Sequence, residues 1–407
     1  MTCRDWTRAA LLGVFVLVVA LASGGVGFAA GWHLSPHSLP SPTASPQTTQ
    51  EDVQQRFRVF WEAWDIIDRE FNRDAPLDTQ KMIYGALSGM VRSLGDPHTV
   101  WIEPMQAKIL DQDMEGSFEG IGANVDLVDG ELVIVEPLPD SPALKAGLRA
   151  GDVVVEVDGK PVKGLDLAQA VLLVRGPKGT QVRLLIRRKG EPSPFEVVVT
   201  RGKIEMPTVT YRLLDDGIAY VRLTEFNLQA TTRLQAALRT VMEKKPRALI
   251  LDLRGNPGGY LHIAVQVASQ FIKDGVIVTE KDRDGKITEY RAEGKGLALS
   301  IPMAVLVDSG SASAAEILAG AIQDNGRGVL IGRRTFGKGS VQAPHTLSDG
   351  SSLRVSIARW YTPKGHQIDG KGLTPDIEVP IDPSTPPEKD PVLDRAVQYL
   401  LKSQAHP

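Results

Sequence analysis

The chain has 407 residues, a length that predicts two or three domains. Its 46 basic and 49 acidic residues leave a formal net charge of −3, and its 42% hydrophobic and 23% charged residues are typical of a globular protein. This composition excludes a disordered, collagen-like or polytopic membrane protein. It also argues against nucleic acid as the partner, because phosphate binding needs a basic face. The single cysteine, Cys3, excludes a disulfide framework, and we expect no metal and no cofactor.

The first 34 residues are typical of an export signal. Arg4 and Arg8 precede an uncharged stretch, 9–34, that is long enough to cross a bilayer. A cleaved signal peptide and an uncleaved signal anchor both fit. We favour the anchor because the apolar stretch is long and a Pro/Ser/Thr-rich linker follows at 35–50. Either way, the rest of the chain is predicted to be extracytoplasmic, on the periplasmic or cell-surface side, and this segment would tether it to the membrane.

Two amphipathic helices are predicted after the linker. Apolar residues recur at helical spacing from Val53 to Phe71 and again from Met82 to Leu94, where Gly95 ends the second helix. Together they predict a helical N-terminal region over 51–116. Its large aromatic side chains fit equally well a homodimer interface formed by these helices and packing onto the same chain.

Short strands separated by glycine turns are predicted between residues 117 and 203, with one short helix at 166–174. A glycine-containing loop opens this region, and taken alone it favours an ordinary turn. The loop residues are Gly120, Ile121, Gly122 and Ala123. Together with Ser141–Leu148 and Gly151–Val154, the loop resembles a bacterial-type PDZ domain. The resemblance implies that the loop amides bind the C-terminal carboxylate of a peptide, which then adds as a strand.

Strands alternate with helices between residues 205 and 380, which predicts an α/β layered domain. We expect strands at 217–226, 248–253, 302–307 and 329–332, and helices at 229–245, 260–272 and 312–324. A later strand is predicted from the alternation of Leu353, Val355 and Ile357 with polar residues, which favours one buried face.

Two polar residues in this domain could carry chemistry. Ser313 lies between a predicted strand and a predicted helix, where free backbone N–H groups favour developing negative charge. The same serine fits a capping box with Glu316, and taken alone that interpretation is favoured. Lys338 lies between two glycines and fits either a solvated loop or a buried general base of lowered pKa, with Gln342 able to orient it.

Several blocks, taken in order, make the pattern specific. They are Gly95–Thr99, Leu251–Gly259, Ser311–Ile317, Thr335–Gln342 and Gly370–Asp376. Over residues 53–380 the chain resembles the carboxyl-terminal processing, or tail-specific, proteases. The resemblance implies an α/β (α+β) multidomain protein that has a helical N-terminal region, a PDZ domain and an α/β serine-protease core.

The resemblance also assigns roles to residues. It implies that Ser313 is the nucleophile, Lys338 the general base and Gln342 its support. The implied oxyanion donors are the backbone N–H groups of Ala314 and of the turn Gly258–Gly259. Arg175 matches a further segment of the family, and it fits equally well a surface arginine and a link between PDZ occupancy and activity.

These expectations define a serine endopeptidase that recognises the C-terminus of exported polypeptides and cleaves near it through an acyl-enzyme. The predicted parts are a signal at 1–34, a linker at 35–50, a helical region at 51–116, a PDZ domain at 117–203, a peptidase core at 204–380 and a tail with a short helix at 381–407. Two alternatives remain: a non-catalytic exported PDZ scaffold, and a Ser-His-Asp hydrolase using His345 or His98. We expect a structural role for His98.

Overall fold

The structure is a computed structural model that describes residues 50–205, 208–380, 386 and 389–405. The predicted export signal lies outside these residues, as does the linker apart from its last residue, Gln50. Within the described part of the chain, no helix is both long and apolar enough to span a membrane. The chain divides into two compact units, 1–79 and 80–407, of which the second holds the predicted PDZ domain and the predicted α/β core.

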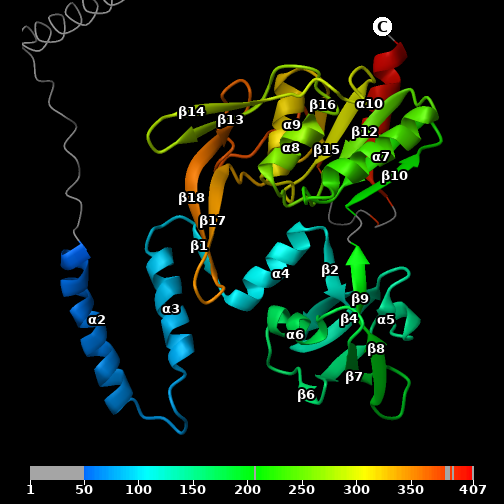
Figure 1. Cartoon of the computed structure of the whole chain (residues 1–407). Coiled ribbons are helices and arrows are strands. Elements are labelled where there is room, and N and C mark those ends of the chain that lie inside the picture. The colour runs from blue at the N-terminus through cyan, green and yellow to red at the C-terminus, as the bar shows by residue number, and fades with distance from the viewer. Residues whose placement is uncertain (1–49, 206–207, 381–385, 387–388, 406–407) are drawn as a thin grey trace, which may run out of the picture. The chain divides into compact units, whose positions relative to one another are not determined.

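The first unit contains the helix α2 (Gln50–Glu70), which confirms the first predicted helix (Figure 1). Four aromatic rings stack along it at centroid distances between 5.2 and 6.2 Å: those of Phe57, Phe60, Trp61 and Trp64. Phe57 and Trp61 are exposed. An interface on this helix therefore stays a prediction.

The helix α3 (Thr79–Arg92) begins at the boundary of the two units, and it confirms the second predicted helix. The strand β1 (Val100–Ile102) and the helix α4 (Pro104–Met114) follow. The turn between α3 and β1 is closed by Asp96, whose carboxylate accepts hydrogen bonds from the N–H groups of His98 and Thr99.

The predicted PDZ domain is built from two antiparallel sheets. Its elements are β2 (Ser117–Gly120), β3 (Ala123–Val128), β4 (Glu131–Pro137), α5 (Pro142–Lys145), β5 (Val153–Val157), β6 (Lys160–Pro161), α6 (Leu167–Val174), β7 (Gln181–Arg187), β8 (Phe195–Thr200) and β9 (Gly202–Glu205). The main sheet has the order β3-β4-β5-β7-β8, so β3 is an edge strand, and β2 pairs with β9. Asp166 caps α6 through a capping box with Gln169.

The region after the predicted PDZ domain contains the predicted α/β layers and forms the core of the second unit. Its sheet has the order β10 (Val209–Leu213), β11 (Ile218–Leu223), β12 (Ala248–Asp252), β15 (Met303–Val307), β16 (Val329–Gly332) and β19 (Ile377–Glu378). All neighbours from β11 to β19 run parallel, and β10 is antiparallel to β11. The helices of the core are α7 (Ala230–Glu243), α8 (Leu261–Ala268), α9 (Ala314–Asp324) and α10 (Pro391–Ala405).

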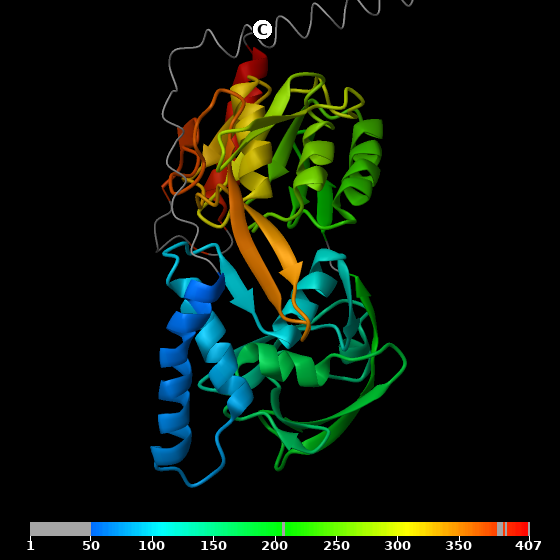
Figure 2. The ribbon, with the colours of Figure 1, turned by 60° about the vertical axis from the view of Figure 1, so that its left-hand side comes forward.

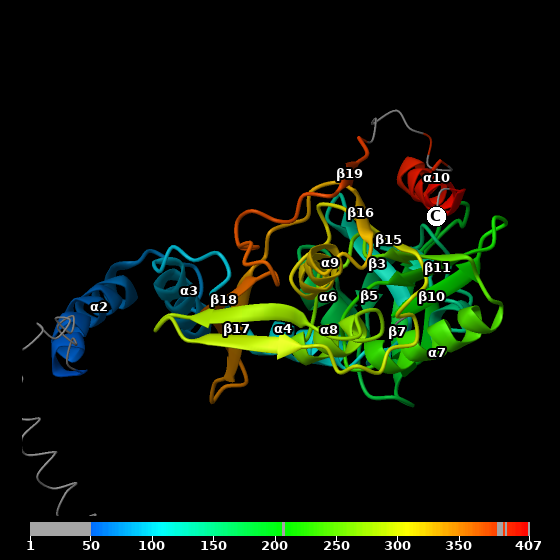
Figure 3. The same ribbon diagram turned by 90° about the horizontal axis from the view of Figure 1, so that it is seen from above.

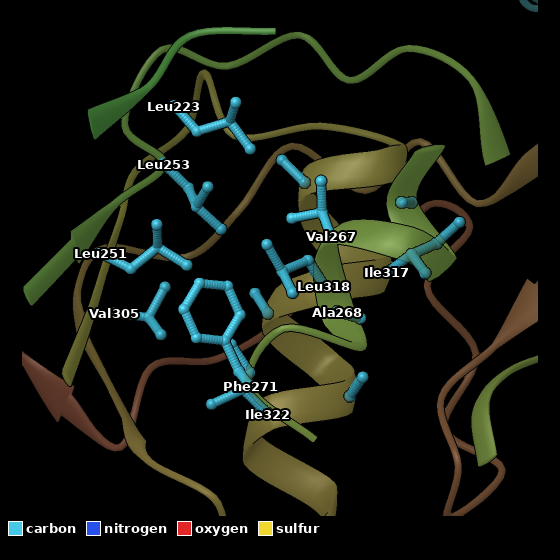
Figure 4. Packing of buried hydrophobic residues seen from close by; sticks show 14 of the residues in the cluster. Leu223, Leu251, Leu253, Val267, Ala268, Phe271, Val305, Ile317, Leu318 and Ile322 are labelled. Atoms are coloured by element: carbon cyan, nitrogen blue, oxygen red, sulfur yellow. The ribbon is translucent and has the colours of Figure 1, made fainter. Parts of the chain in front are cut away.

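Helices cover both faces of this sheet. One face packs on α7, α8 and α9 through residues that include Leu251, Phe271 and Leu318, all fully buried (Figure 4). The other face packs on α10, which lies where a short helix was expected in the tail, through Val392 and Leu400. Viewed from above, α10 lies on one side of the sheet and the other three helices on the opposite side (Figure 3). Parallel strands are buried on both faces in this way because water would otherwise meet an apolar surface.

A second sheet has the order β1-β18-β13-β14, and β17 also pairs with β18. Its strands are β13 (Val276–Asp282), β14 (Ile287–Arg291), β17 (Ser340–Thr346) and β18 (Ser352–Tyr361). β17 and β18 form a long antiparallel hairpin, drawn in orange in Figure 2.

The prediction that Leu353, Val355 and Ile357 form one buried face of β18 is wrong in part. Leu353 and Val355 are half-buried, but Ile357 is 46% exposed, and the next buried residues are Ala358 and Trp360. The reason is a shift of register between the pairs Gln342–Ser356 and Val341–Ala358, which leaves Ile357 without an opposite residue. Such a β-bulge turns the following side chains to the other face.

Candidate active site

Ser313 lies at the carboxyl edge of the core sheet, six residues after β15 ends and directly before α9. Its backbone has φ 53° and ψ −114°, a region that non-glycine residues rarely occupy. The turn Gly255–Gly259 packs closely against it. A Cβ atom placed on Gly258 would lie 2.7 Å from Cβ of Ser313 and 2.9 Å from N of Ala314. Strain of this kind is concentrated at functional sites, and here it places the Ser313 side chain beside the turn.

Glu316 connects the serine to the lysine. The residue is fully buried, and its Oε2 accepts the N–H groups of both Ser313 and Lys338, each at 2.9 Å. Its Oε1 accepts the N–H of Gly337 at 2.7 Å and the hydroxyl of Thr335. Burial raises the pKa of Glu316, while these four donors act against that rise. One carboxylate therefore fixes two segments that lie more than twenty residues apart in the sequence.

Lys338 lies in the loop that leads into β17, and the loop is held from several sides. Thr335 donates its N–H to the carbonyl of Leu373 at 3.1 Å and accepts the N–H of Leu373 at 2.7 Å. A Cβ atom on Gly339 would lie 2.1 Å from N of Asp369, so only glycine fits there. Burial, and secondly the charge of Arg354, lower the pKa of Lys338. A lysine in this setting carries a larger neutral fraction near neutral pH than a solvated lysine.

Gln342 lies on β17 and donates its side-chain N–H to the backbone carbonyl of His98. That hydrogen bond fixes one end of the amide, and an orienting role toward Lys338 stays a prediction. The backbone N–H of His98 donates to the carboxylate of Asp96, and its Nε2 lies 3.9 Å from Oδ1 of Asp369. His345, the other histidine considered, is exposed on β17.

The predicted oxyanion donors differ in their present hydrogen bonds. The N–H of Gly258 donates to Oδ1 of Asn256 at 2.9 Å in this conformation, so it would have to release Asn256 before binding an oxyanion, and its role as a donor stays a prediction. Asn256 is fully buried beside this turn. Its side-chain N–H donates to the carbonyl of Leu223, which leaves Oδ1 to accept the N–H of Gly258. Ala314 lies in the first turn of α9, where backbone N–H groups have no partner within the helix. Gly259 forms an isolated parallel β-bridge with Phe226, and a Cβ atom on Gly259 would lie 2.3 Å from the carbonyl oxygen of Phe226.

A groove of about 200 Å³ lies between the edge strand β3 and the helix α6. Ile121, Gly122 and Ala123 of the predicted peptide-binding loop line it. Gly120, the fourth loop residue, pairs with Gly202 in the β2–β9 ladder instead. An edge strand offers unpaired backbone groups to an incoming strand, so the groove has the geometry that strand addition needs.

Arg175 follows α6 and lines the same groove. Its Nη2 donates to Oδ1 of Asp113 at 2.9 Å, and its Nη1 lies 3.4 Å from Oε1 of Gln112, both at the end of α4. The guanidinium also lies over the ring of Phe118, 4.1 Å from the centroid. Since the side chain is largely buried by these contacts, Arg175 is not a free surface arginine.

Sequence reasoning did not assign two residues to this site. Glu316 was identified only as a helix cap, although a carboxylate three residues after a candidate nucleophile was a usable signal. Arg354 carried no signal, because its position near Lys338 depends on how β17 pairs with β18.

Comparisons with known proteins identify the family of the two domains. A profile of peptidase family S41 matches residues 217–379, and a PDZ domain profile matches residues 133–188. The carboxy-terminal-processing protease of Bartonella bacilliformis is 38% identical over 337 residues, which are 81% of this chain and 77% of that protein. The carboxy-terminal processing protease CtpB of Bacillus subtilis is 34% identical over 362 residues, which are 88% of this chain and 75% of that protein.

Among solved structures, a Bacteroides fragilis chain assigned to the S41 proteases is 18% identical and has a TM-score of 0.52. The similarity covers 84% of this chain and 97% of that chain, and at this identity it concerns the fold alone. The chain is thus a protease with a PDZ domain, and its substrates are polypeptides. More narrowly, it belongs to the carboxy-terminal processing proteases of peptidase family S41.

Proposed function

We propose that the protein is a serine endopeptidase that binds the C-terminus of exported polypeptides in its PDZ groove and cleaves near that end with Ser313 and Lys338. The observation that carries this proposal is the shared acceptor of the two residues, Oε2 of Glu316. A carboxylate that binds both backbones holds a nucleophile and a base in one fixed arrangement, as a Ser/Lys pair requires.

In the proposed reaction, neutral Lys338 takes the hydroxyl proton of Ser313 while Oγ attacks the peptide carbonyl carbon. The N–H groups of Ala314 and Gly259 stabilise the oxyanion of the tetrahedral intermediate, and Gly258 could join them only after releasing Asn256. The C–N bond then breaks, and the leaving amine takes the proton from Lys338. A water molecule, deprotonated by the same lysine, releases the acyl group and restores the serine. Gln342 would support Lys338 in these steps.

The PDZ groove supplies specificity in this proposal. A substrate would add beside β3 as a further strand, and its carboxylate would meet the amides of the loop Gly120–Ala123. We further propose that Arg175 connects groove occupancy to cleavage, since it lines the groove and is hydrogen-bonded to α4. Arg175→Ala should therefore sharply reduce cleavage while a C-terminal peptide still binds. Unchanged turnover, with the exposed Arg187→Ala as a matched control, would remove Arg175 from this role.

The organisation of the chain follows the same proposal. The segment 1–34 would anchor the protein to the membrane, with the linker 35–50 and the domains 51–116, 117–203 and 204–380 on the extracytoplasmic side. The N-terminal helices would form the contact of a homodimer. The exposed aromatic side chains of α2 support that last point.

The decisive experiment compares the wild type with Ser313→Ala in the source organism. New C-termini among exported proteins are read by mass spectrometry, and they should be present only with the wild type. Identical sets of C-termini would favour the non-catalytic PDZ scaffold. Lys338→Ala, His98→Ala and His345→Ala then separate the mechanisms. Loss with the lysine variant alone supports the Ser/Lys pair, and loss with a histidine variant supports a Ser-His-Asp hydrolase.

A further inference from the structure

The turn beside Ser313 is tied to the C-terminal helix by an ion-pair network. Asp252, the last residue of β12, is fully buried and accepts the hydroxyl of Tyr220 at 2.6 Å. Arg254 pairs with Asp252 at 2.6 Å on one side. On the other side its Nη1 and Nη2 donate to Oδ1 and Oδ2 of Asp390, both at 2.8 Å. The arginine therefore bridges two carboxylates, of which the second comes from the far end of the chain.

Arg254 is placed directly before the turn that faces Ser313. Its own N–H donates to Oδ1 of Asp252 at 2.9 Å, and the N–H of the next residue, Gly255, donates to Oδ1 of Asp308 at 2.9 Å. The carbonyl of Asn256 accepts the N–H of Ala312 at 2.9 Å. The position of Arg254 thus sets where the turn begins, and a displacement there would reach Gly258 and Gly259.

Asp390 is itself fixed by α10. Its Oδ1 accepts the N–H of Leu393 at 3.0 Å, so the residue is the N-cap of that helix. Val392 and Leu400 bury the helix against the core sheet. Burial opposes the charge of Arg254, but hydrogen bonds to Asp252 and Asp390 outweigh it and raise its pKa. A carboxylate anchored by a buried helix is therefore a rigid partner for the arginine.

The guanidinium has space to move if this partner is lost. A cavity of about 330 Å³ borders Arg254 and Asp390 and is also lined by Arg222 and Arg333. With Asp252 as its one remaining partner, Arg254 would keep its contact on one side and could turn toward this cavity on the other. Asp308 also borders this cavity, so a neutralised Asp390 removes part of the negative charge that balances the three arginines there, in addition to its hydrogen bonds.

We propose that Asp390 is a positioning residue for catalysis, and that α10, which begins directly after it, therefore helps to hold the active site in place. By accepting hydrogen bonds from Nη1 and Nη2 of Arg254, Asp390 keeps the turn Gly255–Gly259 against Ser313. The inference rests on the proposed function, because it takes Ser313 as the nucleophile. Removal of α10 would expose the apolar face of the sheet and unfold the core, so point variants are the appropriate test.

The test measures kcat and KM for fluorescein-labelled β-casein with the full chain. Asp390→Asn keeps a good N-cap but removes the charge, so it separates the ion pair from the helix cap. Asp394→Asn, at an exposed position in the first turn of the same helix, is the matched control. We expect Asp390→Asn to lower kcat about tenfold with KM changed less than about twofold, and the control to behave as wild type. An unchanged kcat in Asp390→Asn overturns the inference.

Two controls keep this result interpretable. Ser313→Ala is assayed in parallel, and activity in that variant would refute the proposed function rather than the role of Asp390. If Asp390→Asn lowers the melting temperature by more than a few degrees, a double-mutant cycle with Arg254→Lys replaces it. Losses in kcat that are less than additive support a shared action of the two residues, and additive losses overturn it.

Discussion

The backbone N–H groups of Ser313 and Lys338 donate to the same oxygen atom, Oε2 of Glu316, each at 2.9 Å. The two residues come from different elements, the start of α9 and the loop before β17. Neither loop can shift without breaking a charge-assisted hydrogen bond to a fully buried carboxylate. The relative position of the proposed nucleophile and the proposed base is therefore set by the core of the protein rather than by solvent-exposed loops.

This arrangement predicts the effect of Glu316→Gln. An amide offers one acceptor oxygen and one NH2 group, and the NH2 group would face backbone donors that have no lone pair to offer. We expect a loss of about 1–3 kcal/mol in the free energy of unfolding and a fall in kcat of about a hundredfold. Urea unfolding and peptide cleavage measure the two quantities. Glu243→Gln, at an exposed position on α7, removes the same charge and should change neither. Wild-type kcat in Glu316→Gln would show that the shared carboxylate is dispensable.

The pH dependence of cleavage should report the state of Lys338. Only the neutral amine accepts a proton, so kcat/KM should rise with pH, with a midpoint below the ordinary lysine value of 10.5. Burial and then the charge of Arg354 lower the pKa of Lys338. The carboxylate of Glu316, which accepts the backbone N–H of Lys338, is another titratable group beside it.

Arg354→Gln removes one positive charge and should move this midpoint to higher pH, because the Lys338 amine is easier to protonate without a positive charge nearby. Arg354→Lys keeps the charge and should leave the midpoint close to the wild type. Arg291→Gln, at an exposed position on β14, changes the net charge equally and serves as the control. The same midpoint in Arg354→Gln and wild type would exclude an electrostatic role for Arg354.

Gly258 should tolerate no side chain. Its φ of 104° disfavours L-residues, and an added Cβ would lie 2.7 Å from Cβ of Ser313. Gly258→Ala should push the turn and Ser313 apart and reduce kcat by at least about a hundredfold. Gly255→Ala in the same turn also has a positive φ, 67°, but its Cβ meets nothing within 4 Å. That control should lose stability modestly and keep most of its activity, and equal losses in the two variants would contradict the steric explanation.

The sequence predicted the layers of the core because buried strands and amphipathic helices are local patterns. Strand and helix alternation from 205 to 380 needed no tertiary information, and the position of Ser313 between β15 and α9 followed from it. The bulge at Ile357 could not be predicted, since a bulge is set by the partner strand, here β17.

The hydrogen bonds within the site were equally hidden. The sequence places Gly258 in a turn but says nothing about Asn256, whose side chain takes the N–H expected for the oxyanion. In the same way, an ordinary capping box predicted Glu316 at the third position of α9 but not its contacts with Thr335, Gly337 and Lys338. Contacts between segments that are distant in sequence depend on the assembled fold, and no local pattern in the amino-acid sequence predicts them.

The PDZ groove offers a last prediction, at Gly122. This residue has φ 73°, and an added Cβ would lie 2.7 Å from Cβ of Ser141 and 2.8 Å from Cδ1 of Ile204. Gly122→Ala should therefore displace the loop away from both side chains and move its amides out of the position in which we propose that they bind the carboxylate. We expect affinity for a fluorescent C-terminal peptide to fall at least about tenfold by anisotropy, because a carboxylate needs several N–H groups aimed at one point. Gly130→Ala, with φ 76° and nothing within 4 Å of its Cβ, is the control in the same domain. Equal affinity in Gly122→Ala and Gly130→Ala would place the carboxylate somewhere other than this loop.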